Sequence, residues 1–318
     1  MRAVAEYVMR GRNQALWVSV IGASTLMFSW LSAAVLALVT LRRGPGEGVY
    51  ILAWAVLPAG FLLAVFGEMG PLGMITGTTA LAVLLRWTMS WQLTLIGASL
   101  IGALTGLGLL LLGVSYLEQL AAIFAEFFTQ FEAQLSQGDE QVKLQAPGIA
   151  TIAGMLGFMN AASCVMCLLL ARWWQAALYN PGGFRQEFHS IRFTPAVSTV
   201  LVLIMMLIGT YGLEYRPWAV LFAVPLSVAG LGYVHARAAH RKLGTTWLTI
   251  FYILWLVLDP MKLIVIGVAV ADSYIDFRSR WQQRPPPGGK PDGDKTSLGN
   301  DDPDNNESTS KDEDDKDF

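Results

Sequence analysis

Long apolar runs separated by short polar segments are the main pattern along this chain. A helical run of about 18 residues or more can cross the roughly 30 Å hydrocarbon core of a bilayer. Such a helix hydrogen-bonds its own backbone, which lipid cannot do. The pattern predicts an all-α, polytopic transmembrane helix bundle of seven or eight crossings within residues 1–284. The apolar runs cover residues 15–41, 49–66, 72–85, 91–116, 148–171, 195–212, 218–234 and 247–270.

The first run, residues 15–41, follows a basic leader over residues 1–13. It is too long for the apolar segment of a signal peptide, so we expect an uncleaved membrane anchor. Its length leaves two alternatives, a single crossing or a tight hairpin that breaks near Ser29 and Trp30. The hairpin would keep the leader on the same side of the membrane as Arg42.

The last run, residues 247–270, contains the sequence Asp-Pro-Met-Lys at 259–262. Charges at membrane depth are costly and usually functional. Asp259 and Lys262 would share one face of a helix, and Pro260 would break it. Broken helices line substrate sites in transporters. The alternative is a turn between an entering and a returning helix, with the charged pair at an interface.

Lysine and arginine gather in three connections, residues 42–43, 172–192 and 237–242, whereas residues 118–140 are acidic. Basic connections face the cytoplasm in most membrane proteins. We therefore expect these three connections inside and the acidic connection outside, together with residues 214–216.

Residues 116–137 differ from the crossings because apolar and acidic positions alternate at helical spacing. This predicts an amphipathic helix lying on the outer membrane surface. The alternative is an extension of the preceding helix that packs on the bundle. The apolar positions are Leu117, Leu120, Phe124, Phe127, Phe128, Phe131 and Leu135.

Small residues recur one helical turn apart in two of the predicted crossings. Gly73 and Gly77 form one row, and Ala98, Gly102 and Gly106 form another. Such rows let helix backbones approach closely in membranes. They predict a tight bundle rather than a ligand site.

Composition adds an acidic tail to this basic, apolar body. The chain is 54% hydrophobic and only 14% charged, against roughly 25% charged in soluble domains. Residues 285–318 hold four lysines and eleven acidic residues, a net charge of −7, so residues 1–284 carry +5 within the overall −2. This tail has almost no apolar residue, and we expect it to be disordered.

Few residues suggest chemistry. Phosphate-loop, zinc-protease, hydrolase and dinucleotide-binding motifs are absent from the sequence. Cys164 and Cys167 lie in an apolar run and are expected to be packing residues. His189, His235 and His240 fall in or beside basic connections and are expected to be polar loop residues rather than metal ligands. We therefore expect no catalytic residues, no metal and no cofactor.

One basic connection contains a candidate ligand site. Asn-Pro-Gly-Gly at 180–183 forces a turn, and its exposed N–H groups, together with Arg185, could hold an anion. The candidate binding residues are Asn180, Gly182, Gly183, Arg185, Glu187, Asp259 and Lys262. The alternative for the turn is a purely structural one, with an Arg185–Glu187 surface pair.

Three segments carry a resemblance to a known family: Leu-Arg-Arg-Gly at 41–44, Asn-Pro-Gly-Gly-Phe-Arg-x-Glu-Phe at 180–188 and Ala-Asp-Ser-Tyr-Ile-Asp-Phe-Arg at 271–278. With them, residues 1–284 resemble the YybS-like family of bacterial multi-pass membrane proteins. That family is more distantly similar to the substrate-binding membrane subunits of energy-coupling-factor transporters, which dock through an Ala-x-x-x-Ala motif. Here the first run offers Ala15-x-x-x-Ser19-x-x-x-Ala23 and, later, Ala33-x-x-x-Ala37.

The resemblance implies a bacterial inner-membrane protein. Together with the patterns above, it leads us to expect a transport-related or small-molecule-binding subunit without catalysis of its own. Its partners would be the lipid bilayer and other membrane subunits, not nucleic acid. One alternative is a membrane scaffold for an envelope-associated complex. Another is an enzyme acting on lipid through Arg185, Glu187 and His189.

Overall fold

The computed structural model describes residues 2–135 and 144–282, and within these ranges all regular structure is helical. The predicted tail, residues 285–318, lies outside the described residues. The helices are α1 Arg2–Arg10, α2 Arg12–Ala23, α3 Ser29–Arg43, α4 Pro45–Phe66, α5 Gly70–Thr88, α6 Trp91–Leu112, α7 Val114–Leu135, α8 Ile149–Tyr179, α9 Gly183–Ser190, α10 Pro195–Thr210, the 3-10 turn η1 Leu213–Tyr215, α11 Arg216–Leu221, α12 Ala223–His240, α13 Thr245–Val257, α14 Asp259–Ile275 and α15 Phe277–Gln282.

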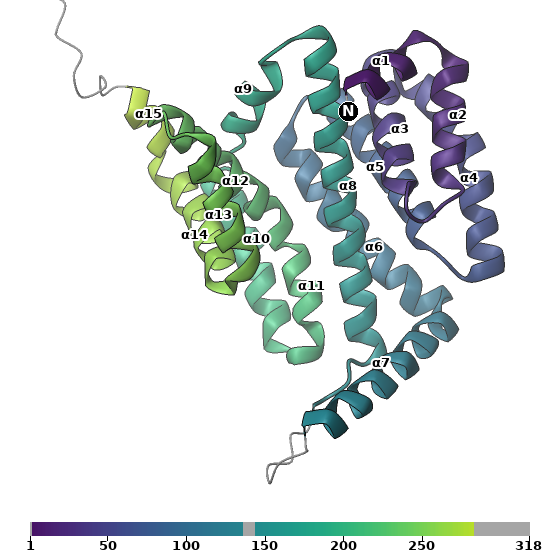
Figure 1. The fold of residues 1–318 in the computed structure, drawn as a ribbon. Helices are drawn as coiled ribbons and strands as arrows, with labels where there is room; N and C mark the ends of the chain where they lie inside the picture. The colour runs from purple at the N-terminus through teal and green to yellow at the C-terminus, as the bar shows by residue number, and fades with distance from the viewer. Residues whose placement is uncertain (1, 136–143, 283–318) are drawn as a thin grey trace, which may run out of the picture.

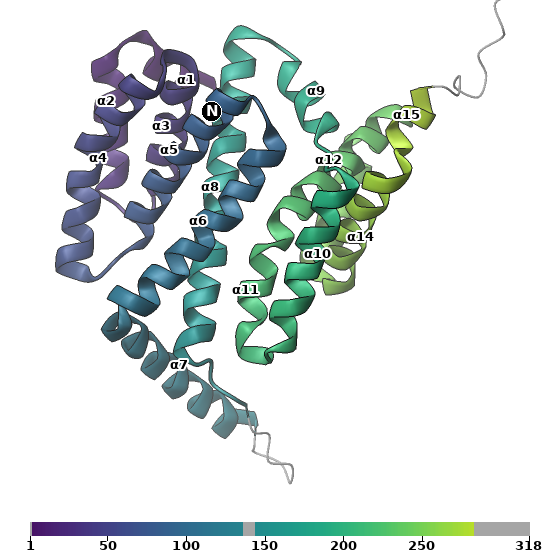
Figure 2. The ribbon, with the colours of Figure 1, turned by 180° about the vertical axis from the view of Figure 1, so that it is seen from behind.

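Helix α8, 31 residues long, runs between two groups of helices (Figures 1 and 2). Helices α1 to α5 lie on one side and α9 to α15 on the other, and α6 crosses α8 obliquely. Hydrogen bonds join α6 and α8 to the second group: Ser99 of α6 donates to the carbonyl of Leu221 at 2.8 Å, and the Trp218 indole donates to that of Ala150 in α8 at 2.9 Å. The described helices therefore form one connected bundle.

Helix α3 is the centre of the first group. Its residues from Ser32 to Val39 are fully buried, and it packs against α2, α4, α5 and α8. Most of these buried residues are alanine, valine or leucine, whose compact side chains fit between closely spaced helices. The helix joins all the surrounding helices of this group into one core.

The first apolar run is a helical hairpin. Helices α2 and α3 pack together, and Ser32 of α3 donates a hydrogen bond to the carbonyl of Ser19 in α2 at 2.7 Å. The chain reverses at residues 24–28, just before the predicted break at Ser29. With 12 and 15 residues, the two helices are only about 18 and 22 Å long. The hairpin alternative is therefore confirmed, but each arm is shorter than a bilayer core.

The predicted row of small residues on α6 brings this helix against α8. A Cβ added at Gly157 of α8 would overlap the carbonyl oxygen of Gly102, and one added at Gly106 would lie 2.8 Å from that of Ala153. Gly77 of α5 approaches α8 in the same way, with Cys164 as its neighbour. The expectation of tight packing at these rows is confirmed.

Several helices are long and apolar enough to cross a membrane. Three meet this description alone, namely α4, α6 and α8. Three bent pairs, α9 with α10, α11 with α12, and α13 with α14, raise the number among the described residues to as many as six. Seven or eight crossings are not confirmed and stay a prediction.

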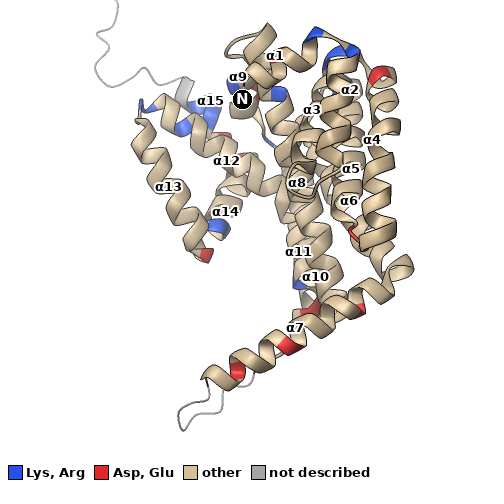
Figure 3. Cartoon of the chain, turned by 45° about the vertical axis from the view of Figure 1, so that its right-hand side comes forward, with Lys and Arg blue, Asp and Glu red and all other residues tan. Residues whose placement is uncertain are grey.

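Charge is divided between the two ends of the bundle (Figure 3). Arginines gather at the end that carries α1, α9, α15 and the N-terminus, whereas acidic residues follow α7 at the opposite end. The connections predicted to share one side of a membrane thus lie at one end of the structure.

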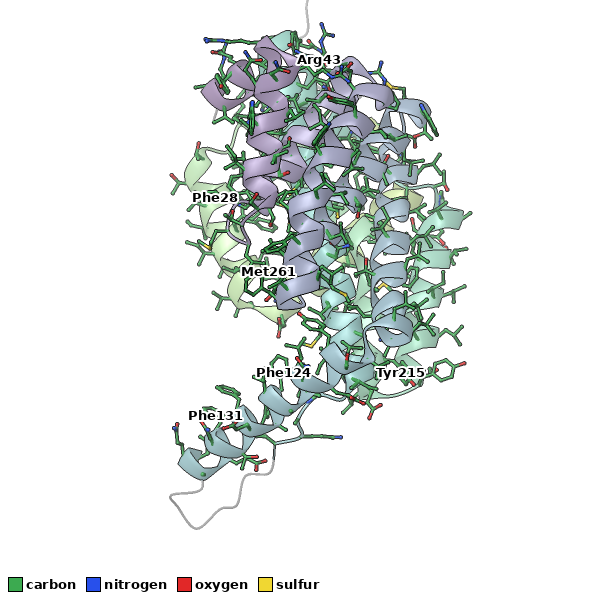
Figure 4. The ribbon with its side chains drawn as sticks, turned by 90° about the vertical axis from the view of Figure 1, so that its right-hand side faces the viewer. Phe28, Arg43, Phe124, Phe131, Tyr215 and Met261 are labelled. Carbon is green, nitrogen blue, oxygen red and sulfur yellow. The ribbon has the colours of Figure 1, made fainter. Side chains whose placement is uncertain are left out.

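Helix α7 leaves the bundle at an angle, and only Leu117 near its start is buried (Figures 1 and 4). Its labelled phenylalanines, Phe124 and Phe131, lie on the side of the helix that looks toward the bundle end. Phe127 and Phe131 stack with parallel rings, their centroids 6.0 Å apart. Most of α7 is thus not buried against the bundle, and its place on a membrane surface stays a prediction. Residues 136 and 137 lie outside the described part.

Candidate functional site

A cavity of about 840 Å³ opens at the arginine-rich end of the bundle. It lies where the ends of α3, α5 and α8 meet the start of α6 and the short helix α9. Polar and apolar side chains share its wall. They are Leu41, Arg42, Leu85, Arg86, Met89, Trp91, Gln92, Arg172, Gln175, Glu187, Ser190 and Ile191.

A paired arginine and glutamate form one side of this cavity. Arg172 of α8 binds both carboxylate oxygens of Glu187 on α9, and its Nε lies 2.9 Å from Oε2. The indole of Trp91 also donates to Oε2, at 3.4 Å, and Arg172 donates to Gln175 at 3.2 Å. In a bidentate arginine–carboxylate pair of this kind, the two hydrogen bonds fix the relative orientation of the side chains, and the two charges neutralise each other. It positions α9 over the end of α8.

Two further arginines line the cavity without a carboxylate partner within ion-pair distance among the described residues. Arg42 lies over the ring of Tyr179, 4.1 Å from its centroid. Arg86 donates to the carbonyl of Leu41 at the end of α3. With three arginines and one glutamate, the cavity wall carries a net charge of +2. An anionic guest would therefore be stabilised there.

The Asn-Pro-Gly-Gly segment forms the turn between α8 and α9. Gly182 has φ of +90°, a conformation that glycine adopts without steric cost, and the N–H of Gly183 donates to the carbonyl of Asn180 at 3.0 Å. These three residues shape the turn but do not line the cavity. A binding role for them stays a prediction.

Of the other predicted residues in this segment, Glu187 lines the cavity and Arg185 does not. Arg185 is exposed on α9. The Arg185–Glu187 surface pair of the structural alternative is wrong, because Glu187 binds Arg172 instead. Residues two apart on a helix do not face each other, which explains the difference.

The second predicted pair lies far from the cavity. Asp259 and Lys262 form an ion pair of 2.7 Å at the start of α14, where the chain bends by 112° relative to α13. Neighbouring Met261 lies toward the α7 end of the molecule, away from Arg43 at the basic end (Figure 4). The pair is exposed at the tip of two helices that meet at a sharp angle, and the structure does not bring it together with Glu187.

The third family-like segment holds a separate polar cluster. Arg278 binds the buried Asp272 at 3.1 Å and donates to the carbonyl of His189, while Asp276 pairs with Arg192. The hydrogen bond from Arg192 lowers the pKa of Asp276 below its ordinary value. Burial lowers the pKa of Arg278, and the Asp272 carboxylate opposes that shift. The cluster attaches the C-terminal helices to the connection between α9 and α10.

The histidines and cysteines have packing partners. His235 lies 2.7 Å from the Tyr252 hydroxyl, and its ring centroid is 6.3 Å from that of His189. Cys164 and Cys167 are buried free thiols between helices. No group of three or more metal-ligating side chains occurs among the residues described.

Sequence reasoning missed Arg86, Gln92 and Gln175, three polar residues of the cavity wall. Arg86 follows the run 72–85, Gln92 lies at the start of the run 91–116, and Gln175 falls in the basic connection 172–192. At these places the pattern indicates only helix boundaries. The sequence places Arg42 and Arg172 in basic connections but does not indicate that they belong to one cavity. The available signal was a set of arginines at several helix ends predicted to lie on the same side.

Comparisons with known protein families, with curated proteins and with solved structures give no match for this chain.

Proposed function

We propose that this chain is an integral inner-membrane protein that binds a small molecule in the cavity at its basic end, as a transport-related subunit without catalysis of its own. The observation that supports the proposal is the cavity itself. Its volume falls within the roughly 300–1,000 Å³ typical of ligand sites, and a few convergent polar groups stand among apolar ones.

The proposal includes an orientation. Because basic ends face the cytoplasm in most membrane proteins, the cavity would open toward the cytoplasm, and α7 would rest on the outer surface. The sequence has no ATP-binding motif, so active transport would need a partner or an ion gradient.

The distant similarity to energy-coupling-factor subunits receives little support as a model for docking. Ala15, Ser19 and Ala23 are fully buried within the bundle, as are Ala33 and Ala37. Neither small-residue row is therefore exposed to a partner subunit. Membership of the YybS-like family remains a proposal based on the three quoted segments.

The test is purification of the full chain from its native membrane in mild detergent, followed by mass spectrometry of the small molecules retained. A Gln175→Trp variant would fill the cavity, and we expect it to lose the retained molecule. Met166→Trp is the matched control, because Met166 lies on the same helix but faces outward, 66% exposed. Equal retention by both variants, or no retained molecule in the wild type, would contradict the proposal.

A membrane scaffold is the second candidate, favoured by the exposed face of α7 outside the bundle. The same purification separates the two candidates. A scaffold would retain partner proteins that are lost when Phe127 and Phe131 are changed to serine, while the Gln175→Trp variant would retain them.

The role predicted for Asp259 and Lys262 is tested by the double variant Asp259→Asn/Lys262→Gln. The pair lies outside the cavity, so we expect the retained molecule to be unchanged. Loss of that molecule would move the proposed site to the tip of α13 and α14.

A further inference from the structure

We propose that the guest of this cavity carries a phosphate group, bound between Arg42 and Arg86. The inference rests on the proposed binding function and names the chemistry of the ligand. It depends on which charged groups of the wall are already paired and which are not.

Arg172 is excluded as the main anion-binding group because Glu187 already occupies it. Both carboxylate oxygens of Glu187 face the guanidinium, and Gln175 takes a further N–H. An anion entering the cavity would have to break this pair to reach Arg172. The unneutralised charge therefore belongs to Arg42 and Arg86.

These two guanidinium groups differ from Arg172 in what they contact. Arg42 stacks on Tyr179, and Arg86 donates to a backbone carbonyl, so each retains N–H donors that no carboxylate accepts among the described residues. A planar guanidinium can bind two oxygens of one phosphate. Two unneutralised arginines correspond in charge to the roughly −1.5 to −2 of a phosphate monoester at pH 7. A single carboxylate would leave one of the charges uncompensated.

The rest of the wall indicates that the phosphate is attached to a larger body. Leu41, Leu85, Met89, Trp91 and Ile191 contribute apolar surface, and Gln92 and Ser190 add neutral polar groups. The cavity of about 840 Å³ is far larger than inorganic phosphate needs. Both a soluble organic phosphate and the headgroup of a phosphatidic-acid-like lipid have the required chemistry.

The experiment measures binding to the purified full-length protein in two settings. In detergent, the probes are glycerol 3-phosphate and succinate, a dicarboxylate of similar charge. In phosphatidylcholine nanodiscs, the probe is phosphatidic acid at increasing fractions. We expect the wild type to prefer a phosphate monoester. If the natural ligand is a soluble organic phosphate, glycerol 3-phosphate should bind in detergent. If it is a lipid headgroup, phosphatidic acid should bind in the nanodiscs.

The variant Arg42→Gln/Arg86→Gln should weaken that binding about tenfold or more, since hydrogen bonds to charged groups are lost. The single variant Arg42→Gln leaves the hydrogen bond from Arg86 to α3 in place and should weaken phosphate binding several-fold. Elution of this variant at the wild-type volume in size-exclusion chromatography would show that it is folded. Arg10→Gln is the charge-matched control at the same end of the molecule and should bind as the wild type does. Arg10 is exposed and does not line the cavity.

Two results would overturn the inference. The first is that the wild type binds glycerol 3-phosphate and succinate equally and does not bind phosphatidic acid. The second is that the wild type and the double variant bind the phosphate probe equally. If Gln175→Trp loses a retained molecule that has no phosphate, the inference fails and the proposed function stands. If the wild type retains nothing and binds neither phosphate probe, both fail.

Discussion

At the scale of single residues, Glu187 joins side chains from two other helices. It binds Arg172 of α8 and accepts from Trp91 of α6 while belonging to α9. The side chain of Arg172 is only 17% exposed. Loss of the Glu187 carboxylate would therefore leave a largely buried charge without a counter-charge, which costs more than it would for a surface arginine. Among the described residues that line the cavity, this carboxylate is also the only acidic group.

Replacing Glu187 with glutamine should therefore have two opposite effects. The protein should lose roughly 1–2 kcal/mol of stability, because Arg172 keeps a hydrogen-bond acceptor but loses its counter-charge. Phosphate binding should strengthen, because the wall becomes more positive. Thermal unfolding in detergent and the binding assay above measure the two effects. Glu6→Gln, in an exposed pair with Arg2, should change stability by less than about 0.5 kcal/mol; an equal loss in both variants would contradict this account.

The Arg192–Asp276 pair predicts a pH dependence. Because its folded-state pKa is lowered, Asp276 stabilises the protein above its ordinary pKa of 3.8 and loses that contribution as pH falls through the folded-state value. Wild type should exceed Asp276→Asn in unfolding temperature at pH 7, and the difference should vanish as the pH is brought well below 3.8. A difference independent of pH would show that the charge of Asp276 is not what stabilises the connection.

At the scale of elements, the contact between α6 and α8 has the most demanding geometry. Gly102 and Gly157 face each other so closely that neither position has room for a side chain. Gly108 lies on the same helix α6 with nothing near the position of an added Cβ. Gly102 and Gly108 thus form a matched pair for comparison on one helix.

Gly102→Val should destabilise the bundle by about 1–3 kcal/mol or more, as overpacking of a filled core does. Gly108→Val should leave the unfolding temperature nearly unchanged. Thermal unfolding of the two variants in the same detergent provides the measurement. Similar values for both would mean that α6 and α8 are not held at this distance in the membrane.

Helix α7 shows what the spacing of apolar residues can predict. Its apolar stripe, at a spacing of three and four residues, is predicted by the sequence, and the structure leaves that stripe exposed at Phe124, Phe127, Phe131 and Leu135. The break of the first run at residues 24–28 was harder to place, since no proline or charge marks it. The cavity could not be read from the sequence, because Arg42, Arg86 and Arg172 come from separate helices whose distances depend on tertiary packing.

At the scale of the whole molecule, the division of charge predicts the orientation. A cysteine introduced at Gly182 in a variant with Cys164→Ala and Cys167→Ala should not react with a membrane-impermeant thiol reagent in intact cells. A cysteine at Gln134 on α7 should react. The opposite result would reverse the orientation and place the cavity on the outer side.

The burial of α3 has a consequence for how the protein is made. This helix leaves the ribosome before α8, which begins at Ile149 and packs against it. Helices α4 and α5 follow α3 directly, but the part of α3 that contacts α8 has no permanent neighbour until more than a hundred further residues have been synthesised. During synthesis, lipid or the insertion machinery must therefore cover this part of α3. The bundle can complete its packing only after α8, its longest helix, has been inserted.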